Sequence, residues 1–138
     1  MSDVRVGIVG AGANTTTKHI PLLQAINGVE IVGVANRSES SSSAVAKRFG
    51  IPKTYGHWEQ AVADPDTNAI VIGTWPYLHC PVTLAAIGAG KHVLTEARMA
   101  MNAAEARCML DASLAKPCLL YTSPSPRDAT LSRMPSSA

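Results

Sequence analysis

The sequence predicts an α/β protein built on a doubly wound parallel sheet. Short apolar runs rich in β-branched residues alternate along the chain with segments whose apolar residues recur at helical spacing. Strands separated by helices pair in parallel through right-handed crossovers. Because the predicted strands are apolar throughout rather than alternating, we expect helices on both faces of the sheet.

The predicted elements follow one another in a regular order. We expect strands at residues 4–9, 30–35, 53–55, 69–72 and 92–95, of which the third is the weakest. Helices are expected at residues 21–26, 40–49, 57–63, 81–89 and 102–115, the last with Asn102 as its N-cap and Glu105 three residues later. Proline lacks a backbone N–H, so Pro21 predicts either a helix that starts near Ile20 or a kink between Lys18 and Leu22.

The composition excludes several classes of partner. A length of 138 residues allows one domain, and a formal net charge of +2 is far from that of a polybasic nucleic-acid binder. Aromatic residues make up only 4% of the chain, which leaves few platforms for stacking bases. No apolar run approaches the ~20 residues needed to span a bilayer. We therefore expect neither a nucleic-acid partner nor a membrane partner.

Cysteine usage points to a reducing compartment. Cys80, Cys108 and Cys118 are odd in number and lack the spacing of metal ligands. We expect them to be small buried hydrophobic residues, as is usual where thiols stay reduced. The first residues also lack the pattern of a secretory signal. Together these features predict a cytoplasmic protein without a metal site.

The composition changes abruptly after Pro117. Residues 118–138 are rich in Ser and Pro, which is typical of a disordered tail. Residues 118–128 are also one translation of a transposase-type sequencing adapter, and residues 132–138 resemble its distal end. We expect a natural domain at residues 1–117, cut before a second domain, and a non-native, mostly disordered tail at 118–138. The apolar segment 119–121 could still add an edge strand beside residues 92–95.

A glycine-rich loop follows the first predicted strand directly. Gly10 permits the tight turn, and Gly12 lets the backbone approach a pyrophosphate closely, next to the free N–H groups of a helix N-terminus. Thr15 stands where a dinucleotide-binding motif has its third glycine, and it could cap the helix or bond a phosphate oxygen. A glycine turn without a ligand is the alternative. We favour a cofactor-binding loop formed by Gly10, Gly12, Ala13, Asn14 and Thr15.

The end of the second predicted strand bears on the choice of cofactor. NAD-binding folds place Asp or Glu there, on the ribose 2′-hydroxyl, whereas this chain has Asn36-Arg37-Ser38. No carboxylate would repel a 2′-phosphate, and the guanidinium of Arg37 could bind one. This favours NADP(H) over NAD(H). Alternatively, Arg37 is a solvated surface residue and Asn36 bonds the ribose of NAD.

With these motifs the chain resembles the Gfo/Idh/MocA family of oxidoreductases. Members of that family have an N-terminal Rossmann domain and a C-terminal α/β substrate domain. The matching segments are VGIVGAG at residues 6–12, KHIP at 18–21, GTWPYLH at 73–79 and AGKHVLTE at 89–96. The resemblance covers residues 4–115.

The resemblance implies that the loop after the fourth strand lines the cofactor. The family has a Thr-Pro-x-x-x-His-like motif there. Thr74 and His79 match its ends, with Trp75 inserted before Pro76. An alternative interpretation of His79 is a loop histidine bonded to the backbone.

A second family motif, Glu-Lys-Pro, follows the fifth strand. The resemblance implies a glutamate near the nicotinamide ribose and a lysine near the reacting carbon. Glu96 matches the glutamate, whereas Ala97 and Arg98 replace the lysine and the proline. Alanine cannot donate a proton, and arginine stays protonated and is a poor base. The catalytic residue is therefore unknown, with Arg98 and His79 as weak candidates.

These observations predict the cofactor half of an NADP(H)- or NAD(H)-dependent oxidoreductase. Its hydride transfer would act on a sugar, a polyol or a related hydroxy compound. The full-length parent would bind this small-molecule substrate and could form a homo-oligomer through its missing domain. The chain alone is expected to be inactive, because the reaction cleft lies between domains. A non-catalytic dinucleotide-binding module is the alternative, which the alanine at position 97 favours.

Overall fold

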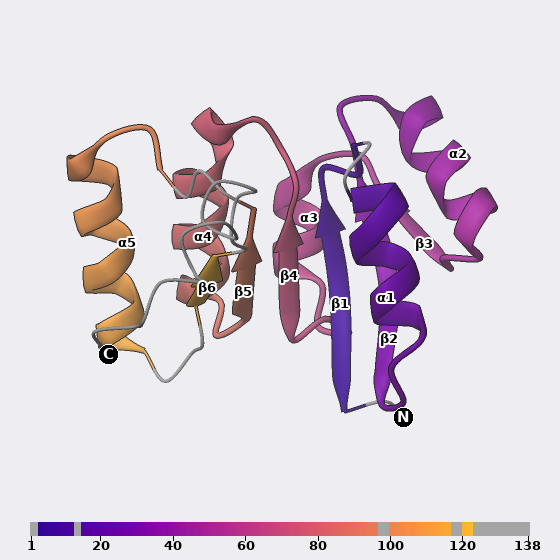
Figure 1. The fold of residues 1–138 in the computed structure, drawn as a ribbon, viewed down its shortest axis with the longest axis horizontal. Helices are drawn as coiled ribbons and strands as arrows, with labels where there is room; N and C mark the ends of the chain where they lie inside the picture. Colours follow the sequence, from indigo (N-terminus) through magenta and orange to yellow (C-terminus); the bar gives the residue numbers. More distant parts are fainter. Residues whose placement is uncertain (1–2, 13–14, 97–99, 117–119, 123–138) are drawn as a thin grey trace, which may run out of the picture.

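The computed structural model describes residues 3–12, 15–96, 100–116 and 120–122. Its centre is a six-stranded parallel sheet with the order β3-β2-β1-β4-β5-β6 (Figure 1). The strands are β1 (Val4–Val9), β2 (Val29–Ala35), β3 (Lys53–Tyr55), β4 (Ala69–Ile72), β5 (His92–Thr95) and β6 (Leu120–Thr122). The order reverses between β1 and β4, as in a doubly wound sheet, so the predicted fold class is confirmed.

Helices cover both faces of this sheet (Figure 1). One face packs against α1 (Ile20–Gln24) and α2 (Glu39–Phe49). The other face packs against α3 (Trp58–Ala63) and α4 (His79–Gly88), and α5 (Ala103–Ala115) lies on α4. Within the described segments, no helix has the length and apolarity that a membrane crossing requires.

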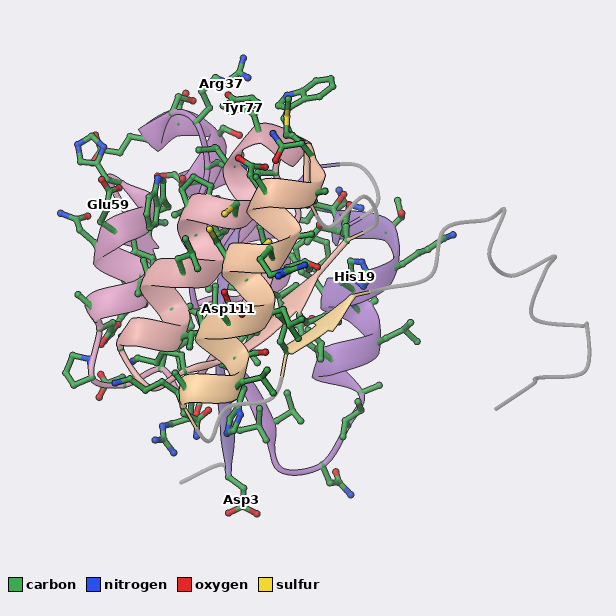
Figure 2. The ribbon with its side chains drawn as sticks, turned by 90° about the vertical axis from the view of Figure 1, so that its left-hand side faces the viewer. Asp3, His19, Arg37, Glu59, Tyr77 and Asp111 are labelled. Atoms are coloured by element: carbon green, nitrogen blue, oxygen red, sulfur yellow. The ribbon has the colours of Figure 1, made fainter. Side chains whose placement is uncertain are left out.

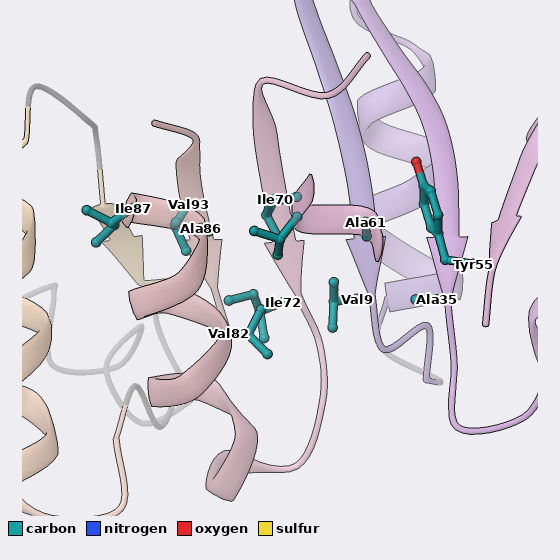
Figure 3. Packing of buried hydrophobic residues seen from close by; sticks show 11 residues of the cluster. Val9, Ala35, Tyr55, Ala61, Ile70, Ile72, Val82, Ala86, Ile87 and Val93 are labelled. Carbon is teal, nitrogen blue, oxygen red and sulfur yellow. The ribbon is translucent and has the colours of Figure 1, made fainter. Parts of the chain in front are cut away.

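Two apolar clusters fill the space between the sheet and its helices. Figure 3 shows the cluster under α3 and α4, in which strand residues such as Ile70 and Ile72 meet Val82 and Ala86 of α4. All four of these side chains are fully buried, and burying one isoleucine contributes about 1.5–3 kcal/mol. The opposite cluster is formed by Val6, Ile8, Ala11, Ile20, Ile31, Val34, Ala46, Ile51 and Val71. The continuous apolar runs of the strands are therefore explained by burial on both sides.

Side-chain caps begin α2 and α5. The Oγ of Ser38 accepts a hydrogen bond from the backbone N–H of Ser41 (3.2 Å), and α2 ends at Phe49, before Gly50 with a φ of 68°. The Oδ1 of Asn102 accepts a bond from the backbone N–H of Glu105 (2.9 Å), which confirms the predicted cap of α5. Such caps satisfy N–H groups that have no partner inside the helix.

The first helix starts with an irregular turn. A five-residue π-helix, η1 (Thr15–His19), leads directly into α1, which begins at Ile20. The missing N–H of Pro21 interrupts the regular ladder at this point, so the predicted start near Ile20 is confirmed. The helix ends at Gln24, earlier than the predicted residue 26, and Gly28 takes a φ of 87°.

Two other expectations need correction. The helix predicted at residues 81–89 begins at His79, after a 3-10 turn, η2 (Pro76–Leu78), because Pro81 fits within a first turn, where no intrahelical N–H bond is lost. Cys80 is buried as expected, but Cys108 is exposed on α5. Cys118 lies outside the described residues.

The edge strand β6 lies beside β5. Leu120 pairs with Val93 in parallel register, and the strand runs one residue later than the predicted 119–121. Ladder hydrogen bonds join backbone groups, so this pairing depends little on side-chain identity. Leu119 and the predicted tail beyond residue 122 lie outside the described residues.

A polar cluster fixes the other edge of the sheet. The hydroxyl of Tyr55 donates to Asp64 Oδ2 (2.6 Å), and Lys53 Nζ donates to the same atom (3.0 Å) and to Asp66 (2.6 Å). Burial raises the pKa of Asp64, but the bonds from Tyr55, from the backbone N–H of Asp66 and from Lys53 outweigh it and hold the pKa below its usual value. The ring of Tyr55 lies against Gly33 of β2, where a Cβ would be 2.6 Å from Cζ.

A buried lysine joins the turns that precede β4 and β5. Lys91 is 7% exposed, and its ammonium donates to the carbonyl oxygens of Asp64 (2.6 Å) and Thr67 (2.5 Å) and to Thr67 Oγ1 (2.9 Å). Burial lowers the pKa of this ammonium. The contacts hold the amino ends of two neighbouring strands together.

Candidate functional site

A cavity of about 680 Å³ opens at the carboxyl ends of the strands. Residues after β1, β2, β4 and β5 line it, so it spans the point where the strand order reverses. Ligands of open α/β sheets bind at this position, and the volume lies in the range of small-molecule sites. Figure 2 shows Arg37 and Tyr77 at this end of the molecule and Asp3 at the other.

Two glycines bring the loops after β1 and β4 into contact at the cavity floor. Gly10 has a φ of 84°, and a Cβ on it would lie 2.7 Å from the backbone N of Thr74. A Cβ on Gly73 would lie 2.5 Å from the carbonyl oxygen of Gly10. The side chains of Thr15 and Thr74 also crowd these places, so the two loops meet closely and no larger residue fits at either position.

Gly12 has a different environment from the glycines of the floor. Apart from its neighbours in the chain, no described residue has an atom within 4 Å of the place where its Cβ would be, and Gly12 lines the cavity. A ligand could thus approach the backbone of the loop closely at this point. The pyrophosphate of a dinucleotide needs such an approach, so the loop fits the cofactor that the sequence predicts.

Asn36 ties the glycine loop to the start of α2. Its Oδ1 accepts from the backbone N–H of Ala11 (2.6 Å), and its Nδ2 donates to Ser41 Oγ (2.8 Å). Its own backbone N–H donates to Ser42 Oγ (2.8 Å). Asn36 is thus held in place by the protein itself, while its exposed neighbour Arg37 lines the cavity.

The loops after β3 and β4 supply a rim of rings. His57 and Trp58 stand at the start of α3, and Trp75 and Tyr77 stand between β4 and α4. The indole of Trp75 is 66% exposed and the phenol of Tyr77 is 53% exposed. Of these four, only Trp75 is a predicted site residue. The others follow strands whose carboxyl ends meet at one sheet edge, and that signal could have identified them.

Glu96 lies at the β5 end of the cavity. Its backbone N–H donates to the carbonyl of Ile72 (3.1 Å), which extends the ladder beyond β5. Its Oε1 accepts from Thr15 Oγ1 (3.0 Å) and lies 3.2 Å from His19 Nε2. Thr15, predicted to cap the helix or bond a phosphate, is buried and holds this carboxylate instead.

The structure brings together most of the predicted cofactor residues. Those that line the cavity are Gly10, Gly12, Asn36, Arg37, Thr74, Trp75 and Glu96. His79 does not line it: the ring is buried in the first turn of α4, and Nε2 donates to the carbonyl of Thr74 (2.9 Å). The interpretation of His79 as a histidine bonded to the backbone is therefore correct. Ala13, Asn14, Ala97 and Arg98 lie outside the described residues.

Opposite charges stand at the two ends of the cavity. Among the described residues that line the cavity, the guanidinium of Arg37 stands at the β2 end and the carboxylate of Glu96 at the β5 end. An elongated ligand with a phosphate at one end and hydroxyl groups at the other would match this order of charges.

Strand order, glycine loop and cavity together define a dinucleotide-binding Rossmann domain. Comparison with known families agrees with this class. The family model described as "Oxidoreductase family, NAD-binding Rossmann fold" matches residues 4–123, and the chain belongs to this Gfo/Idh/MocA family.

Relatives of known sequence are oxidoreductases of about three times the matched length. A 1,5-anhydro-D-fructose reductase of Ensifer adhaerens is 36% identical over 129 residues, which cover 94% of this chain and 38% of the relative. A trans-1,2-dihydrobenzene-1,2-diol dehydrogenase of Mus musculus is 38% identical over 109 residues, which cover 78% of this chain and 32% of the relative. The chain thus spans about a third of the length of the curated relatives it matches.

Solved structures show the same fold. A biliverdin reductase from Synechocystis, solved with biliverdin and NADP⁺, superposes with a TM-score of 0.81 at 28% identity, covering 87% of this chain and 37% of that one. A 3-ketoreductase from Actinomadura kijaniata, solved with NADP, gives a TM-score of 0.82 at 23% identity over 95% of this chain and 41% of that one, and supports the fold alone.

Proposed function

We propose that this chain is the cofactor half of an NADP(H)-dependent oxidoreductase. The observation that carries the proposal is the cavity at the strand-order reversal, with a glycine floor and Arg37 at its β2 end. The dinucleotide would supply the hydride chemistry, and this chain would bind and orient it. Gly12 would admit the pyrophosphate, and Arg37 and Glu96 would set the direction in which the dinucleotide lies.

The preference for NADP(H) is inferred from the charges at the end of β2. Position 36 holds an asparagine and not an acidic residue, and its side chain is hydrogen-bonded to Ala11 and Ser41. The exposed guanidinium of Arg37 is free to fold onto a 2′-phosphate at the cavity mouth, because it carries a planar fork that matches phosphate oxygens. The solved relative with biliverdin contains NADP⁺, which is consistent with this choice.

Titration with both cofactors tests the preference. The purified chain should bind NADPH more tightly than NADH. Binding is measured by the change in fluorescence of the reduced nucleotide. Arg37→Ala should weaken NADPH binding by about 1.5–3 kcal/mol and leave NADH binding unchanged, because only a charged hydrogen bond to the extra phosphate is lost. Lys47→Ala, which removes an exposed cation of α2 outside the cavity, is the matched control. Equal losses for the two cofactors would refute the NADP(H) assignment.

A sugar, polyol or related hydroxy compound is the proposed substrate class. Relatives include a reductase named for an anhydro sugar and a dehydrogenase named for a dihydrodiol. The residues that bind and activate the substrate are proposed to lie in a second domain. We therefore expect no turnover by these 138 residues, while the full-length parent should oxidise or reduce such compounds with NADP(H). Measurable dehydrogenase activity of the purified chain would contradict this division.

A non-catalytic dinucleotide-binding module is the second candidate. It is favoured by Ala97, which stands where the family pattern has its lysine. Assays of the full-length parent with a broad panel of hydroxy and carbonyl compounds distinguish the oxidoreductase from the module. Cofactor binding without turnover of any of these compounds would support the module.

We also propose that the natural sequence in this chain is interrupted after residue 117. The abrupt change to Ser and Pro and the correspondence with an adapter translation support this boundary. Sequencing the gene from source DNA should give a reading frame that continues past Pro117 with different residues. A genomic frame that encodes residues 118–138 as printed would overturn the boundary.

A further inference from the structure

We propose that His19 is a positioning residue for one half of the bound dinucleotide and that it acts through Glu96. The inference rests on the proposed function, since it concerns how the cofactor is oriented. It assigns a role to a residue that lies outside the cavity wall, on the π-helix that follows the glycine loop.

The geometry joins two distant parts of the chain. His19 Nε2 lies 3.2 Å from Glu96 Oε1, and the two side chains are 17% and 20% exposed. Thr15, one helical turn before His19, donates to the same oxygen from a fully buried position (3.0 Å). Residues four apart on a helix share one side, so η1 presents two donors to a single carboxylate oxygen.

The anchored oxygen lies directly against the cavity floor. A Cβ on Gly73 would be 3.2 Å from Glu96 Oε1 and 2.5 Å from the carbonyl of Gly10. Glu96 itself lines the cavity at the end of β5, three strand positions from the β2 end that carries Arg37. At ~4.8 Å per strand, the ends of β2 and β5 lie about 14 Å apart across the sheet.

The fixed position of this carboxylate determines what it can bind. An ionised carboxylate accepts hydrogen bonds and repels phosphate, so it suits the hydroxyl groups of a ribose and not a pyrophosphate. A carboxylate free to swing along the floor would approach the place where Gly12 admits phosphate oxygens. By holding Oε1, His19 and Thr15 confine the negative charge to the β5 end, where it favours the ribose of the half that lacks the 2′-phosphate.

Two ligand probes separate this role from a general structural one. NADPH occupies both halves of the proposed site, whereas adenosine 2′,5′-bisphosphate occupies only the Arg37 half. His19→Ala should weaken NADPH binding by about tenfold, as expected for the loss of a hydrogen bond to a charged group, and should change bisphosphate binding by less than about twofold. Lys18→Ala, its exposed neighbour on η1, should leave the ratio of the two affinities unchanged.

Conservative variants complete the experiment. His19→Gln places an amide N–H near the position of Nε2 and should restore NADPH affinity to within about threefold of the wild type, whereas the shorter His19→Asn should not. This pair tests the inference even if His19→Ala fails to fold. Unchanged NADPH binding in His19→Ala and His19→Asn, or equal weakening of both probes, would overturn the inference alone. Failure of the wild-type chain to bind NADPH would overturn the proposed function as well.

Discussion

Replacing Gly33 by alanine tests whether the Tyr55 ring is locked against β2. A Cβ at position 33 would lie 2.6 Å from both Cζ and the hydroxyl oxygen of Tyr55, far inside ordinary contact. The ring is 7% exposed and its hydroxyl is bonded to Asp64, so it cannot move aside without losing packing and that bond. Overpacking costs about 1–3 kcal/mol and a lost charge-assisted hydrogen bond about 1.5–3 kcal/mol. If the ring shifts, the hydrogen bond to Asp64 is lost but part of the overpacking is relieved, so the two costs do not add in full. We therefore expect the free energy of unfolding to fall by about 2–4 kcal/mol.

Denaturant unfolding followed by circular dichroism measures this loss as a lower midpoint at constant slope. On a Tyr55→Leu background the ring is absent, so Gly33→Ala should cost less than about 0.5 kcal/mol there. Gly88→Ala, at the last residue of α4 with no atom near its Cβ position, is the control and should be neutral or stabilising by about 0.5–1 kcal/mol. An equal cost of Gly33→Ala with and without the ring would refute the reasoning.

Three further outcomes follow from the contacts described above. The folded pKa of Asp64 lies below its unfolded value, so its contribution to stability is present above pH ~4 and is lost as the pH falls through the folded value. Asp64→Asn should therefore flatten the acid side of the stability curve, which urea titrations between pH 3 and 7 would show; an unchanged curve would contradict it. Lys91→Met should lower the unfolding free energy by about 1–3 kcal/mol, because buried acceptors at Asp64 and Thr67 lose their donor. Chemical denaturation measures this loss, and an unchanged unfolding free energy would show that these hydrogen bonds do not stabilise the fold. Gly73→Ala should weaken NADPH binding by about 1–3 kcal/mol, because the new Cβ would clash with Thr15 Oγ1 and with the carbonyl of Gly10. Unchanged fluorescence titrations would contradict this.

The strands were predictable because burial on both faces leaves a plain trace in the sequence. Residues 69–72 and 92–95 are predicted exactly as the structure has them, since a short apolar run bounded by turns has few other uses. Helix ends were less predictable. The start of α4 at His79 depends on how the 3-10 turn before it packs, and Pro81 alone is equally compatible with several nearby starts.

The candidate site was predictable only where it is local. Gly10, Gly12 and Arg37 are recognisable because their roles depend on the strand that each one follows. The burial of His79 and the contact between His19 and Glu96 depend on side chains brought together from distant segments, and no spacing in the sequence encodes such a contact. The rim residues Tyr77 and His57 follow β4 and β3, so their place beyond the carboxyl ends of these strands could have identified them.

The contact between Gly10 and Gly73 also separates two kinds of change that the site can undergo. Where the two loops touch, backbone groups and the side chains of Thr15 and Thr74 enclose the two glycines, so neither position tolerates an added side chain. The rim is made of side chains such as Arg37 and Trp75, which are exposed and contribute little to the core. In a protein built in this way, substitutions on the rim can change which ligands fit the cavity, while the fold and the contact between the two loops stay intact.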